Sequence, residues 1–93
     1  MELKYIVTEE NRVHHFCIFD KTQVHSDIAH GMEGQPVGAG FCTIVGNYDP
    51  DEEYEENDNV IVHCYGRSNS LDIISRPEDS EIIAEKLNRQ EYA

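Results

Sequence analysis

The chain opens with two short apolar runs separated by polar residues. The runs "LKYIVTE" and "VHHFCIF" are rich in β-branched and aromatic residues, and Glu10, Asn11 and Arg12 lie between them. This pattern predicts a β-hairpin with a tight turn. In the second run Phe19 would point to one face of the sheet and Phe16 to the other, because side chains alternate along a strand. We therefore predict that the second strand is a central one, covered on both sides.

The next segment, "DKTQVHSDIAHGM", follows a helical period. Its apolar residues recur every four positions, at Val24, Ile28 and Met32, which indicates a short amphipathic helix. Asp20 or Thr22 can cap this helix, and Gln23 follows Asp20 at the spacing of a capping box. Glycines at positions 31 and 34 and a proline at position 36 should end it, because proline cannot continue the helical hydrogen bonds.

Strand character returns in "VGAGFCTIV", "NVIVHCYG" and "SLDIIS". Gly38 and Gly40 should let another backbone or a bulge come close near the start of the first of these strands. The last two strands are separated by a turn at residues 66–69, so we predict that they pair with each other as a hairpin.

The C-terminal segment "SRPEDSEIIAEKLNRQ" carries the signals of a helix. Ser75 and Glu78 have the spacing of a capping box, and Pro77 suits the first turn. Apolar residues fall on one side that should pack against the sheet, at Ile82, Ile83 and Leu87.

The resulting order of elements is ββαβββα, which predicts one α+β domain over residues 1–93. In this fold class two helices pack on a mostly antiparallel sheet. A chain of 93 residues buries only about 60 to 65% of its unfolded surface, so neither a second core nor a large internal cavity is expected. No apolar stretch has the length of a transmembrane helix or the context of a signal peptide, so we expect no membrane partner.

The charge narrows the choice of partners. Nineteen Asp and Glu residues against seven Lys and Arg give a net charge of -12, which repels nucleic acids and anionic membranes. Direct binding of DNA or RNA is therefore not expected. Such a charge suits a basic protein partner, a cation or simple solubility.

The cysteines indicate a reducing compartment. Cys17, Cys42 and Cys64 are odd in number, and each lies inside an apolar stretch. They are interpreted as reduced core residues of a cytosolic protein. No CxxC pair is present, so a zinc ribbon is not supported.

The stretch at residues 48–59 concentrates the negative charge. Its candidate partner-binding residues are two tyrosines and seven carboxylates, namely Tyr48, Asp49, Asp51, Glu52, Glu53, Tyr54, Glu55, Glu56 and Asp58. A helix-loop-helix calcium site needs a central glycine, and this stretch has none. Two interpretations stay open: a solvated acidic loop between two strands, or a surface that a basic groove accepts in place of a phosphate backbone.

Candidate chemistry elsewhere is sparse. The histidines, His14, His15, His25, His30 and His63, are interpreted as surface residues, and their spacing predicts no metal centre. Only a cross-strand site with His14 or His15 near His63 stays open. His63 and Cys64 are adjacent, but they leave a strand in opposite directions. "GRSNS", with Arg67, could form an anion-binding nest, but we favour hairpin turn chemistry, which Gly, Ser and Asn supply by themselves. We therefore predict no catalytic residue and no cofactor.

The stretches "GAGFC" and "CYGRSNSLDIISRPEDSEII" resemble a group of small uncharacterised accessory proteins from bacteriophages and prophages. Those proteins are similar in size, in an opening like "KYIV" and in a helix with a pattern like "HSDIA". The resemblance implies a phage or bacterial cytosolic context and transfers no catalytic residue.

Together these features favour a small, acidic, non-enzymatic interaction module that engages a basic host or phage protein as a nucleic-acid mimic. One alternative is a small enzyme or ligand-binding protein built around His63, Cys64 and Arg67. The other is a structural homodimer in which an edge strand pairs with its copy.

Overall fold

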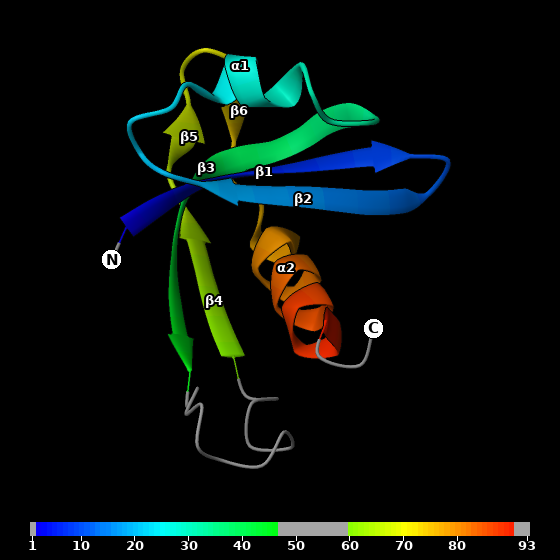
Figure 1. Cartoon of the computed structure of the whole chain (residues 1–93), viewed down its shortest axis with the longest axis vertical. Coiled ribbons are helices and arrows are strands. Elements are labelled where there is room, and N and C mark those ends of the chain that lie inside the picture. The colour runs from blue at the N-terminus through cyan, green and yellow to red at the C-terminus, as the bar shows by residue number, and fades with distance from the viewer. Residues whose placement is uncertain (1, 47–59, 91–93) are drawn as a thin grey trace.

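A computed structural model of the chain describes residues 2–46 and 60–90. In chain order its elements are β1 (Glu2–Glu10), β2 (Val13–Phe19), α1 (His25–Ala29), β3 (Gln35–Gly46), β4 (Val60–Tyr65), β5 (Arg67–Ser68), β6 (Ile73–Ile74) and α2 (Pro77–Gln90) (Figure 1). Four strands form an antiparallel sheet in the order β2-β1-β3-β4, and β5 pairs with β6. The predicted α+β class is confirmed.

The predicted hairpin at the start of the chain is present, but β2 lies at the edge of the sheet. Asn11 and Arg12 form the turn with φ of 53° and 68°, as a two-residue type I′ turn requires. The central strand is β1, which pairs with both β2 and β3. The prediction of a central second strand was therefore wrong. Apolar side chains on both faces of a strand show that both faces are packed, but they do not show how many neighbours the strand has.

β3 is long enough to pair with two strands at different ends. Its residues 35–43 pair with β1, and its residues 41–46 pair with β4. Gly40 lies where these pairings meet, and a Cβ at this position would be 2.5 Å from the Tyr65 carbonyl oxygen. The predicted close backbone approach is therefore confirmed at Gly40.

The predicted pairing of the last two strands was wrong. β4 pairs with β3, while the chain after it forms only the short β5–β6 pair, with Ser68 opposite Ile73. Which strand pairs with β4 is determined by the apolar cluster in which the side chains of β4 are buried. Val62 is buried and Cys64 half-buried in the cluster under α2, and a local pattern cannot report this.

The first helix is shorter than predicted. α1 begins after Val24, which makes no side-chain capping bond. Instead Asp20 stabilises a turn before the helix, because its Oδ1 accepts a hydrogen bond from the Thr22 backbone N–H at 2.8 Å. The predicted apolar spacing holds for Ile28 and Met32, which pack on the core, whereas Val24 is 45% exposed.

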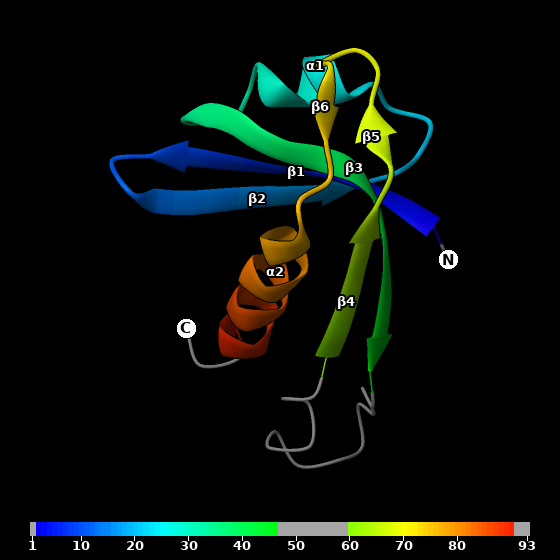
Figure 2. The same ribbon diagram turned by 180° about the vertical axis from the view of Figure 1, so that it is seen from behind.

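Two apolar clusters lie on opposite faces of β1, because Tyr5 and Val7 alternate with Ile6. The α2 cluster consists of Tyr5, Val7, Cys42, Val62 and Ile83. The α1 cluster consists of Ile6, Phe19 and Ala39, with α1 and β6 against it. Figures 1 and 2 show α2 on one side of β1 and β3, and α1 with β5 and β6 on the other. The predicted apolar side of α2 is confirmed, since Ile83 is fully buried and Ile82 and Leu87 pack beside it.

No helix in the described part of the chain has both the length and the apolar character needed to cross a membrane.

Candidate functional site

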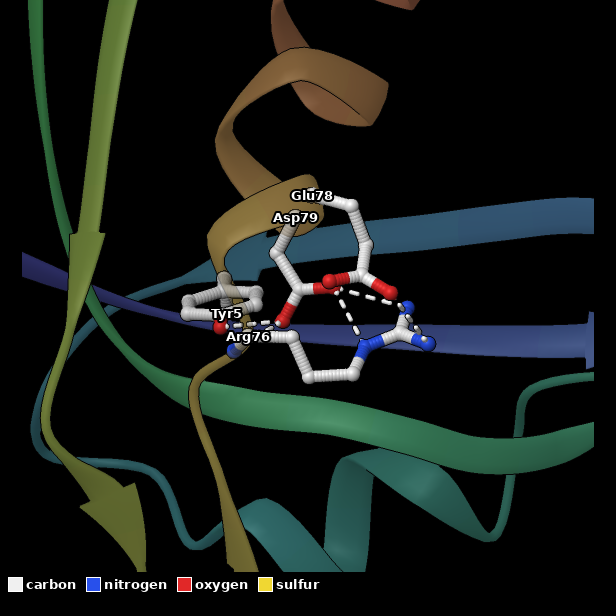
Figure 3. Close-up of polar contacts among 4 residues, drawn as sticks. All are labelled: Tyr5, Arg76, Glu78 and Asp79. Atoms are coloured by element: carbon white, nitrogen blue, oxygen red, sulfur yellow. Dashed lines mark hydrogen bonds and ion pairs between the residues drawn. The ribbon is translucent and has the colours of Figure 1, made fainter.

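A buried carboxylate joins α2 to the centre of the sheet (Figure 3). Asp79 is fully buried, and its Oδ2 accepts hydrogen bonds from the Tyr5 hydroxyl at 2.6 Å and the Arg76 backbone N–H at 3.0 Å. Its Oδ1 accepts bonds from Arg76 Nε at 2.9 Å and Nη2 at 2.8 Å. Gly38 makes room for the carboxylate, since a Cβ there would overlap it. Both oxygens are bonded by protein groups, as is typical of a structural carboxylate.

This network corrects the predicted start of the last helix. The bond from the Arg76 backbone N–H to Asp79, the third residue of α2, is the acidic half of a capping box. The predicted pair, Ser75 and Glu78, lies one position too early. In the sequence an acid follows both Ser75 and Arg76 at a distance of three residues. The contact of Asp79 with Tyr5 determines which of the two acids caps the helix. Burial, followed by the bond to Asp79, raises the pKa of Tyr5 above its ordinary value of 10.0.

The face of β3 and β4 that points away from α2 carries exposed apolar and aromatic groups. We call it the outer face, and it consists of Phe41, Thr43, Val45, Ile61, His63 and Tyr65. Val45 and Ile61 lie opposite each other and are each 65% exposed. The Tyr65 ring stacks on Phe41 and His63 at centroid distances of 6.1 and 5.6 Å. The outer face is therefore a strip of mainly apolar and aromatic side chains.

The Tyr65 hydroxyl fixes one end of this strip. It donates a hydrogen bond to Glu2 Oε2, and this bond raises the pKa of Tyr65 to about 12. At neutral pH the phenol is therefore protonated and tied to a carboxylate.

The predicted partner-binding residues, Tyr48 to Asp58, lie outside the described residues. Their place in the chain is nevertheless defined, because residues 47–59 connect β3 to β4. In the chain the acidic stretch follows Val45 and Gly46 of β3 and precedes Val60 and Ile61 of β4. The exposed pair of the outer face therefore flanks it in sequence.

A shallow cleft of about 420 Å³ gathers two of the seven basic side chains. Lys4, His25, Phe41, Arg67 and Ser70 are among its lining residues. Each base already has a partner: Lys4 Nζ donates to the Gln23 carbonyl oxygen at 2.7 Å, and Arg67 lies 2.5 Å from an Asp72 oxygen. The cleft could take a small anion only in competition with these partners.

His25 forms the buried wall of this cleft, which corrects the interpretation of the histidines as surface residues. Its side chain is only 4% exposed, and its Nε2 lies 2.9 Å from the Gly40 carbonyl oxygen. The ring meets Phe19 edge-on at 5.3 Å. Burial lowers the pKa of His25, so the neutral imidazole donates to Gly40.

The residues proposed for an enzyme or ligand site do not come together. His63 stacks on Tyr65 in the outer face, while Cys64 packs against the α2 cluster on the opposite face of the strand. Arg67 lies beyond both and pairs with Asp72. The predicted divergence of His63 and Cys64 is confirmed, and no nucleophile and base are paired among these three residues.

The cross-strand histidine site left open by the sequence is excluded by the strand order. His15 lies opposite Thr8, near one end of β1. His63 lies opposite Thr43, which is opposite Glu2 at the other end. The two histidines are therefore six residues apart along β1, or about 20 Å, which is too far for both to bind one metal ion.

Within residues 2–46 and 60–90, one other group could hold a metal ion. Glu10, His15 and Glu33 each offer one ligand atom within 4.8 Å of the others. Both glutamates are exposed, and exposed acidic groups often gather without an ion. The expectation that the chain holds no metal stays a prediction. Sequence reasoning missed this group because its members lie on three separate segments.

The helix α2 also covers the free edge of β4. The backbone N–H groups of Val60 and Cys64 donate to Asn88 Oδ1 at 3.1 Å and Ser80 Oγ at 3.0 Å. Side chains of α2 thus take the hydrogen bonds that a neighbouring strand would make. Of the two edge strands of the four-stranded sheet, this leaves β2 for a homodimer formed by strand pairing.

No protein-family model matches the chain, and no curated protein or solved structure is significantly similar to it. Function therefore rests on the chemistry of the surfaces described above.

Proposed function

We propose that the chain is a non-enzymatic interaction module that uses its acidic surface to engage a basic protein of a phage or of its bacterial host. In this proposal the partner accepts the acidic stretch in place of a nucleic-acid backbone. The net charge of -12 favours a basic partner by long-range attraction.

The observation that carries this proposal is the position of the exposed pair Val45 and Ile61. Protein interfaces combine a small apolar centre with a polar or charged rim. Val45 and Ile61 are each 65% exposed and lie opposite each other on β3 and β4, and the seven carboxylates between residues 48 and 59 lie between them in the sequence. Apolar anchor and charge are therefore contributed by one continuous segment.

The test is affinity capture from a bacterial lysate at low salt, followed by binding measurements on each purified captured protein. We expect a basic partner whose affinity falls as salt rises, because exposed charge pairs are screened. Val45→Thr and Ile61→Thr together should lower its affinity about tenfold or more. The matched control is Val13→Thr on β2, where the side chain is 52% exposed. Captured proteins that bind the Val45/Ile61 variant as tightly as the wild type, or show no salt dependence, would overturn the proposal.

A second candidate function is binding of a small anion in the cleft beside His25, favoured by the presence of Lys4 and Arg67 there. Titration calorimetry with inorganic phosphate and with a nucleoside diphosphate tests it. Binding should be lost in Arg67→Gln and retained in Arg12→Gln, which removes an equal charge elsewhere. If both anions give only the heat of dilution with the wild-type protein, this candidate function is eliminated.

A further inference from the structure

Two of the three cysteines face each other across neighbouring strands. Cys42 of β3 and Cys64 of β4 are direct partners in the antiparallel register. Directly opposed residues point to the same face of a sheet, and both side chains pack in or against the α2 cluster. Cys17 is on β2 opposite Ile6 and packs against the α1 cluster, on the other face.

The hydrogen bonds of β4 show which kind of pair this is. In an antiparallel ladder, residues alternate between hydrogen-bonded pairs and narrower pairs whose N–H groups point outward. The Cys64 N–H points outward, since it donates to Ser80 Oγ at 3.0 Å. The Val60 N–H, four residues earlier, points the same way, to Asn88 Oδ1. Cys42 and Cys64 therefore form a narrow pair, for which the Cα atoms are about 4.5 Å apart.

That spacing falls inside the range that a disulfide spans, about 4.4 to 6.8 Å between Cα atoms. The two Cβ atoms of such a pair lie about 4.5 to 5.5 Å apart, so a bond requires them to approach by roughly 1 Å. We propose that Cys42 and Cys64 form a cross-strand disulfide when the folded protein meets a small disulfide such as oxidised glutathione. This inference does not depend on the proposed binding function.

The reaction would proceed by two exchanges. Cys64 reacts first, because it is half-buried whereas Cys42 is fully buried. Its thiolate attacks one sulfur of glutathione disulfide, and one glutathione leaves as a thiolate that takes up a proton. The Cys42 thiolate then attacks the Cys64 sulfur and releases the second glutathione. Two protein thiols are oxidised, and one reagent disulfide is reduced to two thiols.

Burial of the two thiols controls the rate of this reaction. Burial raises the pKa of Cys42 to about 11 and also raises that of Cys64. Because the thiolate is the attacking species, the rate should rise by about tenfold per pH unit in the range below these pKa values.

The test is to treat the folded, reduced full-length protein with glutathione disulfide and map the cysteines by mass spectrometry. Trypsin cannot separate the pair, because no Lys or Arg lies between Cys42 and Cys64. A protease that cleaves at Asp and Glu cuts within residues 49–58 and leaves two peptides that only a disulfide joins. We expect these joined peptides, a loss of two hydrogen atoms in the intact mass, and full reversal by a dithiol.

Matched variants distinguish this pair from general thiol reactivity. Cys17→Ser should leave the reaction unchanged. Cys42→Ser should stop at a mixed disulfide of glutathione with Cys64. In denaturant the selectivity should vanish, and all three pairings should appear. Because the mapping uses the wild-type protein, it holds even if Cys42→Ser fails to fold. Joined peptides that involve Cys17 in the folded protein, or a Cys64 that stays as a mixed disulfide, would overturn the proposal.

Discussion

At the scale of single residues, Asp79 decides how the helix α2 is anchored. The carboxylate is fully buried and bonded to Tyr5 and Arg76, and the Arg76 side chain remains 24% exposed. A buried charge is costly unless it is paired and hydrogen-bonded. The network therefore adds little net stability by itself. Removing one partner should nevertheless be costly, because the remaining buried groups would be left unpaired.

We expect Asp79→Ala to lower the free energy of unfolding by about 3 to 5 kcal/mol, because the buried Tyr5 hydroxyl loses its carboxylate acceptor and Arg76 loses its main partner. Tyr5→Phe should cost about 1.5 to 3 kcal/mol, the value of one bond to a charged group. Glu78→Ala is the control, since that side chain is 55% exposed and 3.6 Å from Arg76, and should change stability by less than about 0.5 kcal/mol. Urea denaturation measures all three, and equal costs for Asp79→Ala and Glu78→Ala would contradict this account.

Three acidic side chains, the fully buried Cys42 and Tyr5 and the half-buried Cys64, should make the fold sensitive to alkali. Burial raises the pKa of Cys42 from 9.0 to about 11, and it also raises the pKa values of Cys64 and Tyr5. The unfolded chain therefore loses these protons first, so stability is retained below about pH 9 and falls as the pH rises toward 11. Denaturation under reducing conditions from about pH 7 to pH 11 tests this. In Cys42→Ala the decline should be shallower, and a stability that stays flat to pH 11 would refute it.

At the scale of elements, the packing of α2 on β3 depends on the missing side chain at Gly38. A Cβ there would overlap the Asp79 carboxylate, so Gly38→Ala should cost about 1 to 3 kcal/mol or more. Gly31→Ala is the matched control, because its Cβ would meet only the Ile28 carbonyl oxygen at 3.7 Å. Combining Gly38→Ala with Asp79→Ala should cost less than the sum of the two single changes. Strict additivity in urea denaturation would show that the two residues do not meet.

The elements themselves were largely predictable, and their partners were not. The β-branched runs and the spacing of Ile82, Ile83 and Leu87 identify strands and a helix by local chemistry. The edge position of β2 and the pairing of β4 with β3 depend on contacts between distant segments. The same is true of Asp79 with Tyr5 and of Cys42 with Cys64, which are far apart in the sequence. A single sequence contains no direct signal for such pairs.

At the scale of the whole molecule, one helix serves both the core and an edge. α2 buries Ile83 against the sheet, and its Ser80 and Asn88 bond the outward N–H groups of β4. The other side of the β3–β4 hairpin stays exposed at Val45 and Ile61. α2 therefore hinders strand addition along this edge of the hairpin, whereas the outer face stays exposed.

The last prediction concerns the charge carried by the segment that joins β3 to β4. If a basic partner is attracted by this segment, neutralising its carboxylates should slow association and flatten the salt dependence of the rate. The variant replaces five acids by their amides, at Asp51, Glu52, Glu53, Glu55 and Glu56. Stability should change by less than about 0.5 kcal/mol, as for other surface substitutions, or increase slightly through reduced self-repulsion.

The matched control removes the same number of charges from exposed positions elsewhere, at Glu10, Asp27, Glu33, Glu78 and Glu81. Both variants then have the same net charge, so a difference between them isolates the position of the charge from its amount. Stopped-flow association rates at several salt concentrations distinguish the two effects, because long-range attraction acts on the rate of encounter. Equal slowing in both variants would assign the attraction to the whole molecule, and unchanged rates in the first variant would reduce the acidic stretch to a connection between two strands.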